Sequence, residues 1–122
     1  MAAIRGALIV VVASAIACGP SAPRRDQIER RIVEAGAVVV GSPDIHQTSS
    51  GESVSWDLHV AAGWPAYREA VAKAFVEQFD IVRNDDELLV LSRVASGDRY
   101  RLEFRATGEA NRVRAVFTAS PD

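Results

Sequence analysis

The strongest constraint on the fold is a strict alternation of apolar and polar residues from Glu52 to Ala61. Val54, Trp56, Leu58 and Val60 form the apolar set, and Ser53, Ser55, Asp57 and His59 form the polar set. Because successive side chains of a β-strand point to opposite faces, one set enters a core and the other meets water. The segment predicts a half-buried strand of an antiparallel sheet with one solvated face.

Three later segments extend this sheet. The segments 100–107 and 112–117 alternate in the same way, and residues 88–91 are apolar on both faces, which indicates a central strand. Short turns around Ser96-Gly97-Asp98 and residues 108–111 connect them as antiparallel neighbours. Between Phe79 and Leu88 the sequence offers Ile81 followed by a polar turn over residues 83–87, so no strand is expected there.

A further strand is expected before the alternating segment. Residues 37–40 form a β-branched run, and residues 45–48 resume it after an interruption at residues 41–44. Pro43 cannot donate to a hydrogen-bond ladder, so this stretch is predicted to be an edge, a bulge or a turn.

Two segments have helical periodicity. Residues 26–35 place Ile28, Ile32 and Val33 on one face, and Gly36 supplies a natural helix end. The second helix is expected to begin at Gly63-Trp64-Pro65, where proline in the first turn costs no hydrogen bond. Its apolar face consists of Tyr67, Val71, Phe75 and Phe79.

These segments predict an α+β fold of the order α-β-β-α-β-β-β. The expected architecture is a two-layer sandwich, in which both helices cover one face of a five-stranded antiparallel sheet. The alternative architecture is a partly closed half-barrel around the second helix. This part of the chain suggests no named domain family.

The N-terminus has the composition of an export signal. Arg5 precedes an uncharged, largely apolar run from Gly6 to Ala17, which is shorter than the roughly 20 residues of a membrane-spanning helix. Gly19-Pro20 follows directly and would break a helix. A cleaved signal peptide is therefore favoured over a retained membrane span.

The end of this run, Ala15-Ile16-Ala17-Cys18, resembles the lipobox of bacterial lipoproteins. The resemblance implies a signal peptide over residues 1–17, a lipid on Cys18 and a bacterial envelope location. The residues after Cys18 have the composition of a flexible tether to residue 24, followed by one domain over residues 25–122. The alternative is ordinary signal cleavage, which would release a soluble secreted or periplasmic protein.

Composition limits the partners. The formal net charge is −2, so the chain lacks the basic excess that nucleic-acid binding requires. Cys18 is the single cysteine, so the domain is expected to fold without an internal disulfide, and no cofactor is expected. The membrane, reached through a lipid on Cys18, and an envelope protein or cell-wall polymer are the expected partners.

Candidate catalytic and metal-binding residues are few. His46 and His59 are the two histidines, and a hairpin around residues 49–51 would bring both to one side of the sheet. Their spacing matches no zinc motif, and Ser53 or Ser55 with His59 and Asp57 gives no recognisable nucleophile motif. We expect no metal and no catalytic residues, and therefore a protein that is not an enzyme.

Two further groups carry binding hypotheses. Arg101, Arg105, Arg112 and Arg114 lie on the polar face of the last two strands, with Glu103 between them. They serve either as cross-strand ion pairs or as a strip for an anionic partner such as a lipid headgroup, a cell-wall polymer or an acidic protein.

Trp56, Trp64 and Tyr67 either belong to the core or line an apolar-ligand pocket beneath the second helix. The expected function is a non-catalytic interaction or scaffolding module tethered to a membrane. A lipoprotein that binds small apolar ligands, and a histidine-dependent envelope enzyme, are the alternatives.

Overall fold

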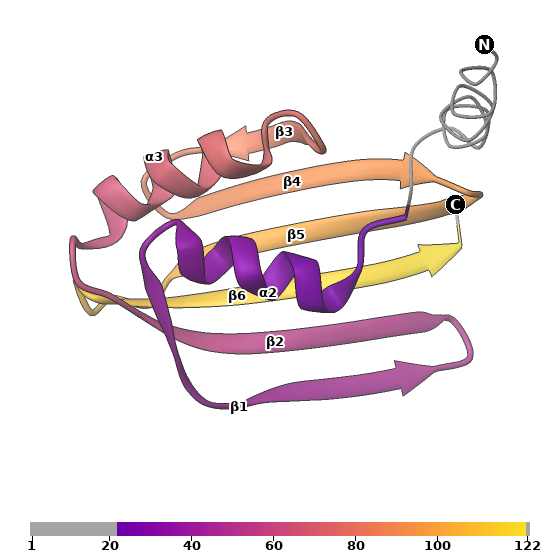
Figure 1. The fold of residues 1–122 in the computed structure, drawn as a ribbon, viewed down its shortest axis with the longest axis horizontal. Coiled ribbons are helices and arrows are strands. Elements are labelled where there is room, and N and C mark those ends of the chain that lie inside the picture. Colours follow the sequence, from indigo (N-terminus) through magenta and orange to yellow (C-terminus); the bar gives the residue numbers. More distant parts are fainter. Residues whose placement is uncertain (1–21, 122) are drawn as a thin grey trace, which may run out of the picture.

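The computed structural model describes residues 22–121, which form two helices and one antiparallel six-stranded sheet (Figure 1). The elements are α2 (Arg25–Glu34), β1 (Ala37–Thr48), β2 (Gly51–Val60), α3 (Trp64–Phe75), β3 (Asp80–Asn84), β4 (Leu88–Ala95), β5 (Asp98–Ala106) and β6 (Arg112–Pro121). The strand order across the sheet is β1-β2-β6-β5-β4-β3. The sheet is open, with β1 and β3 at its two edges, rather than closed around a helix.

The predicted α+β class and antiparallel sheet are confirmed, but the five-stranded sheet and the predicted element order are wrong. The strand that the sequence did not indicate is β3, and the order along the chain becomes α-β-β-α-β-β-β-β. All five residues of β3 are exposed, so this edge strand has no buried set to alternate with a polar set. Its pairing with β4 makes β4 an interior strand, in which Leu88, Leu89, Val90 and Leu91 are all buried.

One hydrophobic core lies between the helices and one face of the sheet (Figure 1). In β2 the predicted alternation holds, since Val54, Trp56, Leu58 and Val60 are all buried. Strands β5 and β6 contribute their own alternate residues to the same cluster. At roughly 1.5–3 kcal/mol for each large apolar side chain removed from water, this layer is the main source of stability.

The two helices meet this face with the expected side chains, with one exception. Ile28 and Ile32 of α2 and Tyr67, Val71 and Phe75 of α3 are buried. Val33 is 44% exposed, so its predicted place on the buried face of α2 is wrong. Gly36 ends the helix region with φ of 122°, a conformation that glycine adopts readily. Neither helix is long and apolar enough to cross a bilayer.

Strand β1 is an edge strand with an irregular centre. Its register with β2 shifts between Val40 and Asp44, around the Gly41-Ser42-Pro43 segment that the sequence marked as an interruption. The strand resumes and continues to Thr48. Pro43 therefore lies at a bulge on a sheet edge, where its missing N–H leaves no ladder position unfilled.

Four chain segments meet at one end of the sheet (Figure 1). These are the start of the described chain at Ala22, the β1–β2 turn, the β4–β5 hairpin and the end of β6. An ion pair between Arg25 and Glu52, with 3.7 Å between Nη1 and Oε2, links the start of α2 to the start of β2. A tether attached at Ala22 would therefore hold this end of the domain.

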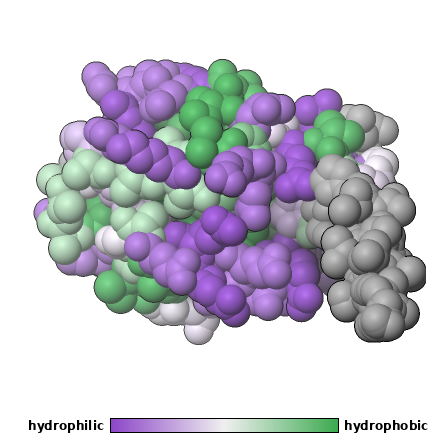
Figure 2. Space-filling view, turned by 45° about the horizontal axis from the view of Figure 1, so that its top comes forward, coloured by the Kyte–Doolittle hydropathy of each residue, from purple (hydrophilic) through white to green (hydrophobic). Residues whose placement is uncertain are grey.

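The helix-bearing side of the described residues is largely hydrophilic in the view of Figure 2. Figure 2 shows hydrophilic side chains over much of this side, with hydrophobic ones gathered in separate patches. Among the described residues, exposed large apolar side chains occur mainly on the edge strands, as Val38 and Ile45 on β1 and Ile81 and Val82 on β3.

Candidate functional site

The outer face of the sheet, which the helices leave uncovered, carries a dense row of arginines on its two middle strands. Alternation on β5 and β6 buries one set of side chains and exposes the other. The charged residues of this outward-facing set form a group that we call the arginine stripe: Arg99, Arg101, Glu103, Arg105, Arg112 and Arg114. The structure brings together all four arginines predicted from the sequence and adds Arg99.

Glu103 holds two arginines of the stripe. Its Oε1 lies 3.1 Å from Nη2 of Arg101, and its Oε2 lies 3.3 Å from Nη2 of Arg105. The side chains of Arg101 and Arg105 remain 52% and 56% exposed, so both guanidinium groups can also meet a partner in solvent. Exposed ion pairs of this kind contribute little to stability, about 0–1 kcal/mol each.

Arg105 and Arg114 are direct cross-strand partners in the β5–β6 ladder. Like charges at such positions destabilise a sheet, because the two Cβ atoms lie only about 5 Å apart. Each guanidinium also contacts a carboxylate: Arg105 contacts Glu103, two residues earlier on β5 itself, and Arg114 contacts Asp57 on β2 at 3.5 Å. The predicted Arg–Glu cross-strand pairs are absent from this ladder, where Glu103 faces Val116 and Arg101 faces Thr118.

Carboxylates flank the stripe on both sides of the outer face. The ladder registers place Asp57 and Asp44 on β2 and β1, and Asp80 on β3, on the same face as the stripe. Asp85 follows β3 and binds Arg83, whose hydrogen bond, together with the backbone N–H of Glu87, lowers the pKa of Asp85. The positive charge is therefore confined to a strip about two strands wide.

The two histidines share this outer face but do not converge. His46 pairs with Ser53 in the β1–β2 ladder, six residues along β2 from His59, which is a distance of roughly 20 Å. His46 Nε2 lies 3.5 Å from Oδ2 of Asp44, and His59 faces Arg112 on β6. Among residues 22–121 no group of three or more His, Cys, Asp or Glu side chains is placed to hold a metal ion.

Ser53, Ser55, Asp57 and His59 lie in one line along β2, on its outer face. Alternate residues of a strand are about 7 Å apart, so neighbouring members are beyond the distance of a proton relay. The carboxylate of Asp57 contacts Arg114. The arrangement provides no oriented base beside a nucleophile.

The three aromatic residues proposed for a pocket are buried in or beside the core. Trp56 donates its indole N–H to Oε1 of Glu29 at 2.7 Å, and Trp64 donates to the backbone oxygen of Asp86 at 2.6 Å. Tyr67 donates its hydroxyl to the backbone oxygen of Ile32 at 2.9 Å, and burial raises the pKa of Tyr67. Each polar atom has a partner, so all three side chains have the contacts expected of packed residues.

Trp64 also borders a shallow apolar depression of about 320 Å³ at the start of α3. Its other walls come from Gly63 and Pro65 and from the β5–β6 turn, including Ala106, Gly108 and Ala110. Trp64 itself is 6% exposed, so little of the indole reaches this depression.

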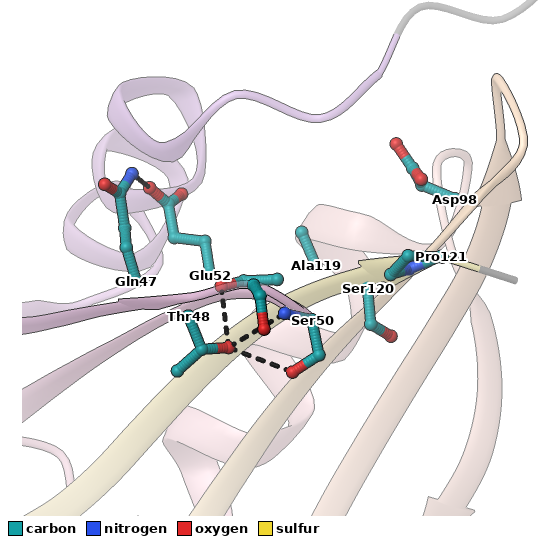
Figure 3. Close-up of a pocket in the computed structure, with 10 residues that line it drawn as sticks. Gln47, Thr48, Ser50, Glu52, Asp98, Ala119, Ser120 and Pro121 are labelled. Atoms are coloured by element: carbon teal, nitrogen blue, oxygen red, sulfur yellow. Dashed lines mark hydrogen bonds between the residues drawn. The ribbon is translucent and has the colours of Figure 1, made fainter.

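A larger concavity of about 510 Å³, with a mixed polar and apolar lining, is at the end of the sheet where the described chain begins (Figure 3). The β1–β2 turn forms one wall, and Asp98, Ser120 and Pro121 form the other. Thr48 Oγ1 lies 2.9 Å from Oγ of Ser50 and accepts the Ser50 N–H at 3.2 Å, while Gln47 donates to Glu52 at 2.9 Å. The turn thus uses much of its hydrogen-bonding capacity internally.

The predicted lipidation site, Cys18, and the signal peptide of residues 1–17 lie outside the described residues. The features that sequence reasoning missed are the flanking carboxylate Asp80 and the additional arginine Arg99. Arg99 could have been predicted, because it is two positions before Arg101 and therefore on the same face of the strand. Asp80 required knowledge of β3, which has no sequence signature.

Comparison of the chain with protein-family models, with curated proteins and with solved structures finds no match.

Proposed function

We propose that this chain is a bacterial envelope lipoprotein, held to a membrane by a lipid on Cys18, whose domain is a non-catalytic interaction module. The outer face of the sheet is its contact surface, and its partner is anionic. The location rests on the lipobox-like sequence that ends at Cys18. A diacyl anchor supplies the two chains that stable attachment needs.

The observation that carries the anionic partner is the pairing of Arg105 with Arg114. Two like charges opposite one another reduce the stability of the sheet, and neither is required by the core, since both side chains point away from it. An anion between the two guanidinium groups would remove the repulsion and form charge-assisted hydrogen bonds with both. Binding of an anion therefore accounts for the presence of Arg105 and Arg114 at opposed positions, whereas a contribution to sheet stability does not.

The anchor is tested by the mass of the mature N-terminus of protein isolated from its host membranes. The expected peptide begins at Cys18 and is heavier by a diacylglyceryl group. A Cys18→Ala variant is expected to leave the membrane fraction. An unmodified Cys18 on a soluble product would contradict the anchor.

The contact surface is tested by pull-down from envelope extracts with the full chain. Arg101→Glu combined with Arg114→Glu should weaken partner capture and leave the melting temperature nearly unchanged, because both residues are about half exposed. Arg24→Glu with Arg30→Glu changes the same net charge at α2, over the opposite face of the sheet, and serves as the control. Equal capture by the two double variants would exclude the outer face.

The depression beside Trp64 supports the second candidate, a lipoprotein that binds a small apolar ligand. Native mass spectrometry of the protein from its own host tests this function. A retained apolar molecule that is lost on Ala110→Arg would favour it, and a bare mass would count against it.

A further inference from the structure

We propose that the anionic partner is one linear chain of phosphodiester units, which lies along β5 and β6 on the arginine stripe. This inference rests on the proposed function and names the chemistry of its partner. It is carried by the width of the stripe, by its length and by the position of its arginines on two neighbouring strands.

The width of the stripe excludes a broad partner. A flat anionic surface would meet the whole outer face, where the stripe and Arg83 supply six arginines. Five carboxylates oppose them, namely Asp44, Asp57, Asp80, Asp85 and Glu103. A chain no wider than the β5–β6 pair meets five arginines and two carboxylates, Glu103 on β5 and Asp57 beside Arg114. The net attraction is therefore large for a narrow polyanion and small for a membrane surface or a wide acidic patch on a protein.

The length of the stripe matches a polymer better than a small anion. From Arg99 through Arg105 to Arg112 the stripe covers eight residue steps along the strands, which is roughly 26 Å. Alternate residues on one strand are about 7 Å apart, so Arg99 with Arg101, and Arg112 with Arg114, can meet successive charges of an extended chain. A single phosphate could bridge Arg105 and Arg114 but would leave the arginines farther along the stripe without a charge to bind.

The placement of arginines on both strands favours phosphodiesters. In a phosphodiester chain the charge lies in the backbone itself, with non-bridging oxygens projecting to both sides. A chain lying over the junction of β5 and β6 therefore presents oxygens to Arg105 on one side and Arg114 on the other. Guanidinium groups bind such oxygens through paired N–H donors. In a polyuronate the charge instead lies on a carboxylate substituent of each sugar ring, outside the backbone.

The test uses the full chain in micelles of a non-ionic detergent, titrated with fluorescently labelled poly(glycerol phosphate). Binding is expected, and it should weaken as salt rises. Arg105→Ser with Arg114→Ser should lower the affinity at least about tenfold, and Arg24→Ser with Arg30→Ser should leave it unchanged. Circular dichroism checks that both double variants are folded.

Competition identifies the chemistry. Unlabelled poly(glycerol phosphate) should displace the probe at lower concentration than polygalacturonate, poly-glutamate or phosphatidylglycerol added to the micelles. Equal displacement by polygalacturonate or poly-glutamate would overturn the phosphodiester assignment, and displacement by phosphatidylglycerol alone would indicate a membrane surface.

The proposed function and this inference can fail separately. Failure of poly(glycerol phosphate) to bind, combined with partner capture from extracts that depends on Arg101 and Arg114, would overturn the inference and retain the proposed function. Failure of both measurements to depend on the stripe would overturn the two together.

Discussion

Arg105 on β5 and Arg114 on β6 occupy directly opposed positions in an antiparallel ladder, and each also contacts a carboxylate, Glu103 on β5 itself and Asp57 on β2. The two guanidinium groups repel each other in the free protein, which lowers its stability, but together they attract an anion from solvent. This repulsion predicts that removing one member stabilises the free protein.

Arg105→Thr should raise the free energy of unfolding by a few tenths of a kcal/mol at low salt, since it removes the repulsion and introduces a residue that favours strands. Glu103 keeps Arg101 as its partner in this variant. Urea unfolding at several salt concentrations checks the effect, which should shrink as screening increases. Arg101→Thr is the matched control, because it introduces the same residue but Arg101 faces Thr118 rather than another charge, and it should show a smaller gain that does not come from relief of repulsion.

Gly51, at the start of β2, predicts a sharp steric effect. A Cβ at this position would lie 2.0 Å from the backbone oxygen of Ala119, so β2 and β6 could not keep their present separation. Gly51→Ala should lower the melting temperature strongly. Gly108→Ala is the control, since Gly108 also has a positive φ of 97° but has no atom within 4 Å of the added Cβ. Equal losses for the two variants would show that backbone conformation, rather than contact with β6, sets the cost.

The hydrogen bond between Trp56 and Glu29 joins α2 to β2 across the core edge. Glu29→Ala should lower the free energy of unfolding by about 1–3 kcal/mol, because it leaves a buried indole N–H without its acceptor. Glu29→Gln keeps an oxygen acceptor and should cost less. Chemical denaturation monitored by circular dichroism checks both variants, and equal costs would mean that the bond contributes nothing specific.

Tyr67 predicts a loss of stability in alkali. Burial raises the pKa of Tyr67 in the folded protein, while an unfolded tyrosine has its ordinary pKa of about 10. Below pH 10 the group is protonated in both states and has no effect on pH dependence. Above pH 10 the unfolded state releases a proton that the folded state retains, so stability falls as pH rises.

Tyr67→Phe should remove most of this alkaline decline, and urea unfolding between pH 8 and pH 11 measures it. Tyr100, whose pKa burial and Asp98 also raise, should supply a smaller remainder. Tyr67→Phe should also lower the free energy of unfolding by about 1–3 kcal/mol near neutral pH, because the backbone oxygen of Ile32 loses its hydrogen-bond donor. An unchanged alkaline slope would exclude Tyr67 as its source.

The proposed anchor predicts which end of the domain faces the bilayer. Ala22 is four residues from Cys18, and even a fully extended chain spans no more than about 14 Å over that length. A fluorophore on Ser50→Cys, at the tethered end, should be quenched by headgroup-bound quenchers in reconstituted vesicles. The same fluorophore on Glu109→Cys, in the turn at the opposite end, should be quenched less. Equal quenching would contradict the end-on arrangement.

The sequence predicted those elements that bury a periodic set of side chains. The alternation in β2, β5 and β6 and the helical spacing of Ile28 with Ile32 each indicate an element whose one face leaves water. It did not predict β3, because this strand is stabilised by its ladder with β4 rather than by burial of its own side chains. The prediction that Val33 is buried was wrong, because the spacing of apolar residues does not give the width of the buried face of α2.

The chain by itself determined the α+β class, the core residues of the middle strands and the presence of arginines on their polar faces, because these follow from local periodicity. The tertiary structure alone decided that Arg105 faces Arg114, that Glu103 lies between two arginines, and that Asp57 and Asp80 flank the stripe. Register and strand order set these relationships, and both arise from packing between segments distant in sequence rather than from any one segment.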